Sequence, residues 1–227
     1  DISYQRLNTY TNFLAETLIQ RLILSVNSQD KKESWDSVCS IKSLINIKNL
    51  RESGYFHLFS PLNLIDAVSN LTSFQRYAYS KNLLEDLSPI FRQNHPSFQG
   101  FICPIQTPES KMVGLTLNTA RGVMTDASGN LFKTNNPNDS SDLGYAASLV
   151  PFYQHNDAAR SMMGSKNLKQ ALPLAESNEP LISTGYEKEV IDIVKPLVKN
   201  QILSDTFFKY KPGIDLLVAY MPWYGWN

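Results

Sequence analysis

Three basic residues at positions 160 to 169 stand in a stretch of sequence that lacks acidic residues. Arg160, Lys166 and Lys169 follow Asp157, and the next acidic residue is Glu176. Cations beside a helix end suit the binding of phosphate oxygens, which arginine holds with a planar fork of N–H donors. A solvated surface would show the same charge pattern. Charge alone therefore leaves a phosphate site and an ordinary surface as alternatives.

Motifs of self-contained catalysis are absent from the sequence. It has no Walker phosphate loop, dinucleotide-binding glycine motif, zinc-protease motif or nucleophile elbow. His57, His95 and His155 are far apart, and none lies four residues from another metal-ligating residue type. Cys103 could use His95 or His155 as a base, but its apolar surroundings favour a small buried side chain. We expect no metal ligands on this chain and no independent enzyme.

The charges of the chain are balanced. Its 227 residues include 21 Lys and Arg and 21 Asp and Glu, so any contact with nucleic acid has to be local. Cys39 and Cys103 are too few for a disulfide framework and favour a reducing compartment. No apolar run approaches the roughly 20 residues needed to cross a bilayer. We therefore expect a cytoplasmic protein that does not enter a membrane.

The elements that must position these residues begin with helices. Steps of three and four residues between apolar positions 7, 10, 14, 18 and 22 predict an amphipathic helix. Further helices are predicted over 41–50 and 61–79. One face of the latter would carry Leu64, Val68, Leu71 and Gln75. Residues 1–95 are accordingly expected to form a helical domain.

The second part, residues 96–227, has a mixed α/β pattern. Its short apolar runs predict a strand over 101–105, a strand or a helix over 112–123, a helix over 186–198 and a buried strand over 216–220. Residues 126–144 are rich in Asn, Asp, Ser and Gly and predict a hairpin or a mobile polar loop. A short helix is expected to be capped by Asn156 and ended by Gly164. The expected fold class is α+β.

Four blocks of the sequence resemble motifs of RNA polymerase β subunits and follow that family's order. A weaker match at residues 69–76 extends the resemblance to about residues 60–227. The first block, residues 95–115, is similar to the family motif H-P-[ST]-x-x-G-x-[IV]-C-P-[IV]-E-T-P-E-G...G-L. The second, residues 147–173, is similar to A-S-L-I-P-F-x-x-H-D-D-A-N-R-x-x-M-G-[AS]...Q-A-x-P. The third and fourth, residues 180–187 and 217–227, are similar to P-L-V-G-T-G-x-E and L-V-A-F-M-P-W-x-G-x-N.

The resemblance implies a piece of the β subunit of a multisubunit DNA-directed RNA polymerase, not a complete enzyme fold. Such a piece would line the active centre and the RNA–DNA hybrid and help to bind the incoming nucleoside triphosphate. Its implied partners are the remaining β fragment, β′-like subunits, the DNA template and nascent RNA, with a promoter-specificity subunit left open. Two Mg²⁺ ions, held mainly by the β′-like partner, would serve nucleotidyl transfer. The chain alone is expected to be inactive.

The resemblance also assigns roles to residues of the 147–173 block. Arg160 matches the arginine that contacts the incoming triphosphate, which makes it the candidate catalytic residue. Asp157 is expected to orient it. Lys166, Lys169 and Gln170 fall where the family lines the RNA and nucleotide side of the active centre.

A second group of candidates lies earlier in the chain. Pro108, Glu109 and Arg92 fall in the loop that, in the family, faces the downstream end of the RNA–DNA hybrid. Arg76 falls near the path of the nascent RNA. Each has a purely structural alternative: Pro108 could only fix a turn, and Glu109 could only pair with a lysine.

The sequence departs from the family pattern at several positions. Ser110 replaces a glycine, while Asn156 and Ala159 replace an aspartate and an asparagine near Arg160, so the local hydrogen bonds are expected to differ. The segment between residues 187 and 216 is much shorter than in cellular β subunits. This trimming suits the split polymerases of some large bacteriophages, with the protein in the infected cell's cytoplasm or in the virion.

Two other functions remain as alternatives. A non-catalytic β-like binding protein would occupy polymerase subunits without supporting synthesis. An unrelated enzyme could use Arg160 and the neighbouring lysines to hold a small phosphorylated substrate, and it would then turn over as an isolated chain.

Overall fold

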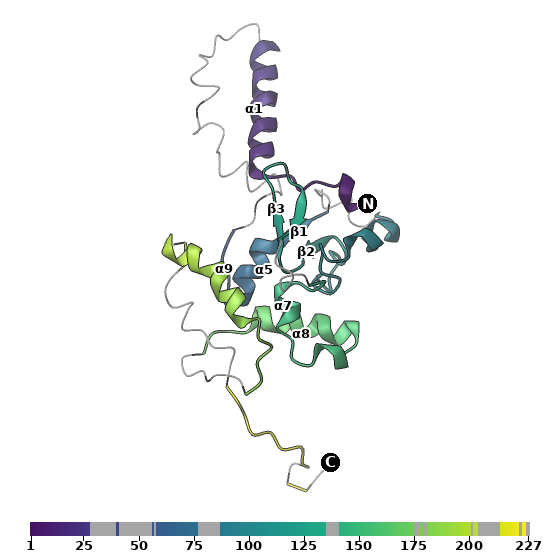
Figure 1. Ribbon diagram of the computed structural model, residues 1–227, viewed down its shortest axis with the longest axis vertical. Helices are drawn as coiled ribbons and strands as arrows, with labels where there is room; N and C mark the ends of the chain where they lie inside the picture. Colours follow the sequence, from purple (N-terminus) through teal and green to yellow (C-terminus); the bar gives the residue numbers. More distant parts are fainter. Residues whose placement is uncertain are drawn as a thin grey trace. The chain divides into compact units, whose positions relative to one another are not determined.

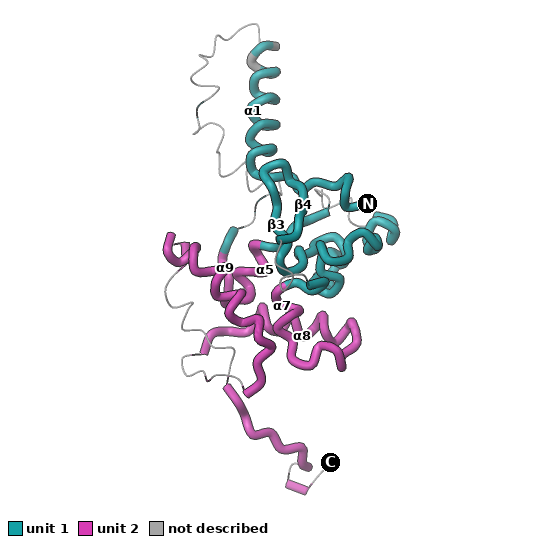
Figure 2. Tube along the Cα trace, in the orientation of Figure 1, with its two compact units in different colours: residues 1–59, 72–144 teal, residues 60–71, 145–227 magenta. Residues whose placement is uncertain are grey.

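The computed structural model describes residues 1–27, 40, 56, 58–76, 87–134, 141–174, 178, 181–200, 202–203, 214–222 and 224–225 (Figure 1). The chain divides into two compact units (Figure 2). Unit 1 comprises residues 1–59 and 72–144, and unit 2 comprises residues 60–71 and 145–227. Each unit is therefore built from two separate stretches of sequence. The domain boundary expected at residues 95 and 96 stays a prediction.

The predicted α+β class is confirmed, since the chain combines helices with small antiparallel sheets. Unit 1 begins with the short 3₁₀ helix η1 (Ile2–Tyr4) and the helix α1 (Tyr10–Asn27). α1 confirms the predicted N-terminal helix. Including Leu7 was wrong, because its N–H donates to the carbonyl of Gly129 at 2.8 Å, before the helix begins. The helix predicted over 41–50 lies outside the described residues.

The described residues of unit 1 also form two antiparallel pairs of strands. They are β1 (Ser73–Gln75) with β2 (Thr116–Asn118), and β3 (Val123–Thr125) with β4 (Leu131–Lys133). In the first pair Phe74 lies opposite Leu117. The second pair confirms a hairpin at the start of the polar stretch 126–144, of which residues 135–140 lie outside the described residues.

The hairpin turn is closed by one aspartate. The Asp126 carboxylate accepts from the main-chain N–H of Asn130 at 2.8 Å and from its side-chain amide at 2.9 Å. These hydrogen bonds, the side-chain one first, lower the pKa of Asp126. Gly129 follows with φ of +84°, in the left-handed region that suits glycine.

The strand predicted over 101–105 is wrong except for a single bridge between Ile102 and Thr119. Pro104 has no N–H to donate, so a ladder cannot continue past it. Over residues 112–123 the chain adopts the strand alternative, within β2 and at Val123, the first residue of β3. Where the structure describes the stretch between β1 and β2, it contains the 3₁₀ helices η2 (Pro89–Arg92) and η3 (Pro96–Phe98).

A small apolar cluster holds this part of unit 1 together. Phe98, Ile102 and Leu117 are buried, and the partly buried Phe74 packs against them. Because Phe98 ends η3 and Leu117 lies in β2, the cluster joins the 3₁₀ segment to the sheet. The loop over residues 107–114 is part of the connection between these two elements.

Unit 2 is helical in its described residues. Its elements are most of α5 (Leu64–Thr72), α7 (Tyr145–Ser148), the 3₁₀ helix η4 (Tyr153–His155), α8 (Ala158–Gln170) and α9 (Glu187–Lys199). α9 confirms the helix predicted over 186–198 and buries Val190, Val194 and Val198 at four-residue steps.

The helix predicted over 61–79 is confirmed only over α5. Leu64 and Val68 are buried as expected, whereas Leu71 is exposed. Placing Gln75 on the helix was wrong, because the chain leaves the helix after Thr72 and pairs with β2 through β1. Residues 77–79 lie outside the described residues.

α8 differs from its prediction at both ends. Its N-cap is Asp157 rather than Asn156, and the helix continues through Gly164 to Gln170. A Cβ on Gly164 would lie 3.3 Å from Cγ1 of Val150, so this glycine permits close packing instead of ending the helix. α7 and α8 are in contact, which agrees with that packing.

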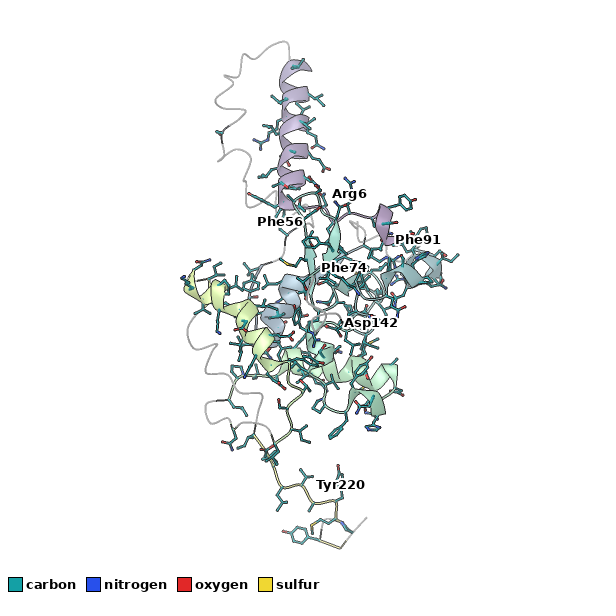
Figure 3. The ribbon with its side chains drawn as sticks, in the orientation of Figure 1. Arg6, Phe56, Phe74, Phe91, Asp142 and Tyr220 are labelled. Atoms are coloured by element: carbon teal, nitrogen blue, oxygen red, sulfur yellow. The ribbon has the colours of Figure 1, made fainter. Side chains whose placement is uncertain are left out.

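The buried strand predicted over 216–220 is wrong. Leu216, Leu217 and Tyr220 are 74%, 104% and 101% exposed, and Figure 3 shows Tyr220 on the extended C-terminal segment. Within the described residues this segment belongs to no sheet, and a lone strand cannot pair its own backbone groups. Of the helices that the structure describes, none is both long and apolar enough to cross a membrane.

Candidate functional site

The start of α8 fixes the main chain at Arg160. The Asp157 carboxylate accepts from the backbone N–H of Arg160 at 2.8 Å, and the Asp157 carbonyl accepts from Ser161 at 3.0 Å. Asp157 is thus a helix N-cap, a role that suits an aspartate because it satisfies a free N–H and complements the helix dipole. Its expected role in orienting the guanidinium stays a prediction.

The two sides of α8 differ in exposure. Ser161 and Ser165 are 1% and 2% exposed and form the buried side. Arg160, Met163 and Gln170 are exposed and follow one another at helical spacing. The exposed side therefore presents a cation, a flexible apolar group and an amide.

The two lysines of α8 occupy different places around the helix. Lys166 is half-buried, three residues after Met163, and lies at the margin of the exposed side. Lys169 is also half-buried, but it follows Arg160 by nine residues and points to roughly the opposite side at about 100° per residue. Around the helix, Gln170 lies about 80° and Lys166 about 120° from Arg160, and Lys169 lies farthest from it.

Sequence reasoning missed Asn63, which touches the far end of α8. Its side chain is 1% exposed, and its amide N–H groups donate to the carbonyls of Leu168 at 2.9 Å, Lys169 at 3.2 Å and Ala171 at 2.7 Å. Its amide oxygen accepts from the N–H of Asp66 at 2.8 Å. The only sequence signal was an asparagine directly before an apolar helix, which indicates an N-cap but not a distant partner.

The candidates of unit 1 surround the loop over residues 107–114. The Arg92 guanidinium donates to the carbonyls of Lys111 at 2.6 Å and Val113 at 3.1 Å. Gly114 donates its N–H to the hydroxyl of Thr107 at 2.8 Å, which closes the loop. A Cβ on Gly114 would lie 2.4 Å from the Arg92 carbonyl oxygen. The backbone segments at Arg92 and Gly114 therefore approach too closely for a side chain at position 114.

Arg76 holds the segment that precedes this loop. Its guanidinium donates to the Gln93 carbonyl at 2.9 Å and lies 5.2 Å from the centre of the Phe98 ring. Within the loop, Pro108 is half-buried and Glu109 is exposed. The structure thus brings the four unit 1 candidates to one region and gives both arginines carbonyl partners.

One further carboxylate organises a loop of unit 2. Glu187 accepts from Thr184 N–H at 2.8 Å and Gly185 N–H at 2.9 Å, and from the hydroxyls of Ser183 and Thr184. Burial raises the pKa of Glu187, but these hydrogen bonds outweigh it and lower the pKa overall. Glu187 was matched only as part of a motif block, and here it ties the 183–185 turn to the first residue of α9.

Metal-ligating side chains do not converge in the described part of the chain. No group of three or more His, Cys, Asp or Glu there could hold an ion. Arg160 and its neighbours offer donors to anions, and the described residues around them do not fit a metal ion.

Comparison with known proteins assigns both units to one family. Residues 60–125 match the sequence model of RNA polymerase Rpb2, domain 3, and residues 146–227 match that of RNA polymerase Rpb2, domain 6. The two matches follow in order and together span more than half of the chain. The chain belongs to the RNA polymerase β-subunit family. The candidates of unit 1 fall in the domain 3 match and those of α8 in the domain 6 match.

Individual β subunits show the same relationship. The chain is 47% identical to the DNA-directed RNA polymerase subunit beta of Phocaeicola vulgatus over 75 residues, or 33% of this chain and 6% of that protein. It is 29% identical to the subunit of Trichodesmium erythraeum, across 60% of this chain and 24% of that protein. It is 24% identical to the subunit of Tupiella akineta, across 88% of this chain and 12% of that protein.

The chain spans less than a quarter of the length of each of these β subunits. The alignment with the Trichodesmium erythraeum subunit is 259 positions long although it covers only 60% of this chain. That subunit therefore carries residues, within the aligned interval, that this β-family chain lacks.

Proposed function

We propose that this β-family chain works inside a multisubunit DNA-directed RNA polymerase, where it lines the active centre and the RNA–DNA hybrid and helps to bind the incoming nucleoside triphosphate. The observation that carries the proposal is the exposed side of α8, which presents Arg160 and Gln170 with Lys166 at its margin, in a segment matched to Rpb2 domain 6. The family match supports the subunit role, and the geometry of α8 supports the triphosphate contact.

Arg160 would contact the triphosphate and act as the catalytic residue. Its side chain is exposed, and its main chain is held by Asp157 in the first turn of the 13-residue helix α8. Because the Asp157 carboxylate already caps this end of the helix, a phosphate group would be held by the planar fork of N–H donors of the Arg160 guanidinium. Lys166 and Gln170 would contact the nucleotide or RNA farther along the same side, with Lys169 a more peripheral contact.

The 107–114 loop would face the downstream end of the hybrid. Arg92 and Arg76 donate to main-chain carbonyls within and before this loop and would hold its shape against the hybrid, with Arg76 near the path of the nascent RNA. Pro108 and Glu109 would meet the hybrid directly.

Two Mg²⁺ ions would support the reaction by activating the RNA 3′-hydroxyl and stabilising the leaving pyrophosphate. Because the described residues of this chain gather no metal-ligating cluster, the ions would be held mainly by a β′-like partner. The other partners would be the rest of the β subunit, the DNA template and the nascent RNA.

The polymerase would be of the split, bacteriophage-encoded kind and would act in the cytoplasm of the infected cell or from the virion. The residues missing relative to the Trichodesmium erythraeum subunit support a trimmed enzyme. Sequencing of the surrounding genome would test this origin. A neighbouring open reading frame for the rest of β would support it, and a single cellular β gene would contradict it.

Primer extension by the assembled polymerase tests the role of Arg160. Arg160→Ala should slow nucleotide addition by about 100-fold or more, the usual loss when a charged transition-state contact is removed. Lys195→Ala is the matched control, since Lys195 is an exposed cation of unit 2 that pairs with Asp192 of its own helix at 2.6 Å. Assembly of each variant is checked by gel filtration.

Undiminished addition by assembled Arg160→Ala would leave a scaffold or a non-catalytic β-like binding protein as the better explanation. Turnover of a phosphorylated substrate by the isolated chain would instead favour the unrelated enzyme.

A further inference from the structure

The side chain of Asn63 connects the ends of two helices within unit 2. It directly precedes α5 and caps that helix through Asp66, while its amide N–H groups reach three carbonyls at the end of α8. These contacts link residues 105 to 108 positions apart in the sequence. One buried amide therefore serves the N-terminus of α5 and the C-terminus of α8 together.

The end of α8 needs such a donor. The last carbonyls of a helix have no partner within it, and a glycine in the left-handed conformation often satisfies them. α8 instead leaves its helix through Ala171 in an extended conformation. Asn63 supplies the missing donors from another helix, and Asp157 supplies the cap at the other end, so α8 is held at both ends.

We propose that Asn63 is a positioning residue for the exposed side of α8 that carries Arg160, Lys166 and Gln170. This inference rests on the proposed function of that side. Leu168 follows Arg160 by eight residues, or about 12 Å along the helix, so Asn63 is too distant to share the phosphate contact of Arg160. It acts by fixing the axis and the last turn of α8. Gln170 lies in that last turn itself.

Asn63→Asp separates the two contacts of this side chain. Aspartate is a good N-cap, so the contact with Asp66 N–H on α5 is kept. The carboxylate has no N–H to give and repels the three carbonyls of α8. Asn200→Asp is the matched control, because Asn200 is exposed at the end of α9 and its main-chain N–H makes the recorded cap hydrogen bonds.

The assembled polymerase with Asn63→Asp should lose about 10-fold or more in kcat/KM for the incoming nucleotide, with a raised KM, while the fraction of primed complexes that extend stays that of the control. Part of the loss should be recovered as the pH falls, because a protonated carboxyl regains one donor. Hydrogen exchange of the 168–172 main chain should be faster than in the control.

A double variant separates positioning from general damage. If Asn63 acts through Arg160, the combination Asn63→Asp with Arg160→Ala should be scarcely slower than Arg160→Ala alone. Losses that multiply would overturn the inference. A wild-type kcat/KM in Asn63→Asp would also overturn the inference, provided that Arg160→Ala slows nucleotide addition. If Arg160→Ala adds nucleotides at the wild-type rate, the proposed function itself is contradicted. Should Asn63→Asp not assemble, Asn63→Ser keeps the cap with one shorter donor, and its expected loss is intermediate.

Discussion

At the scale of single residues, polar side chains of this chain mostly hold loops and helix ends. Arg92 and Arg76 donate to main-chain carbonyls, and Asn63 serves two helices. Glu187 gathers four donors from the 183–185 turn. The resemblance in sequence assigns Arg92 and Arg76 to nucleic acid, yet the hydrogen bonds described for their guanidinium groups go to main-chain carbonyls of unit 1.

Glu187 should make the 183–187 turn sensitive to acid. Its pKa is lowered in the folded chain, so its contribution is complete above the unfolded value of about 4.3 and is lost as the pH falls through the folded pKa. Glu187→Gln should cost about 1 kcal/mol in the free energy of unfolding at pH 7 and little at low pH. Urea unfolding at several pH values measures this difference.

Asp192→Asn is the control for that experiment, because Asp192 is an exposed carboxylate of α9 that pairs with the exposed Lys195. A cost of Glu187→Gln that stays constant down to pH 3 would contradict the assignment.

Sequence could identify some of the site residues and not others. Arg160 stood out because its charge lay in an uninterrupted basic stretch within a motif block. Asn63 did not stand out, because the role of its side chain depends on backbone carbonyls more than a hundred residues later. Every residue has a backbone carbonyl, so a pattern of residue types does not indicate which carbonyls Asn63 contacts. Asp157 was identified, but as a partner of the guanidinium rather than as a cap.

At the scale of elements, α8 depends on its close approach to Val150. Gly164→Leu should cost about 1–3 kcal/mol in the free energy of unfolding, because a Cβ there would already lie 3.3 Å from Val150 Cγ1. Urea unfolding of the chain measures the cost. Asn167→Leu, at an exposed position of the same helix, controls for the effect of leucine on the helix itself.

The added variant Val150→Ala should restore part of the stability of Gly164→Leu by making room for the new side chain. Equal stability of Gly164→Leu and Asn167→Leu would show that the contact with Val150 does not constrain α8.

Elements in which apolar residues recur at a regular spacing were predictable from the sequence. α9 has valines at every fourth position and two glutamates in its first turn, so its pattern indicated a helix from start to end. The end of α8 was not predictable, because a glycine used for packing looks the same as one that ends a helix. The apolar run over 216–220 indicated burial, but burial needs a partner surface that the run does not itself contain.

At the scale of the whole molecule, the chain has no net charge to attract nucleic acid. With 21 basic and 21 acidic residues, the isolated chain should bind an RNA–DNA hybrid no more tightly than about 10⁻⁴ M at physiological salt. The assembled polymerase should bind at least about 100-fold more tightly. Fluorescence anisotropy with a labelled hybrid compares the two.

Micromolar binding by the isolated chain, weakening steeply with added salt, would contradict this prediction. It would mean that the local cations of α8 suffice without partner subunits.

The interleaving of the two units also imposes an order on synthesis. Asn63 leaves the ribosome about 5–20 s before Leu168, given their separation of 105 residues and a typical rate of 5–20 residues per second. Throughout that interval residues 145–227, which complete unit 2 with the stretch that contains the buried Leu64 and Val68, have not yet been made, while the 72–144 stretch of unit 1 is emerging. The nascent chain therefore passes through a stage in which a chaperone has a defined segment to shelter, and rare codons after residue 144 would prolong it.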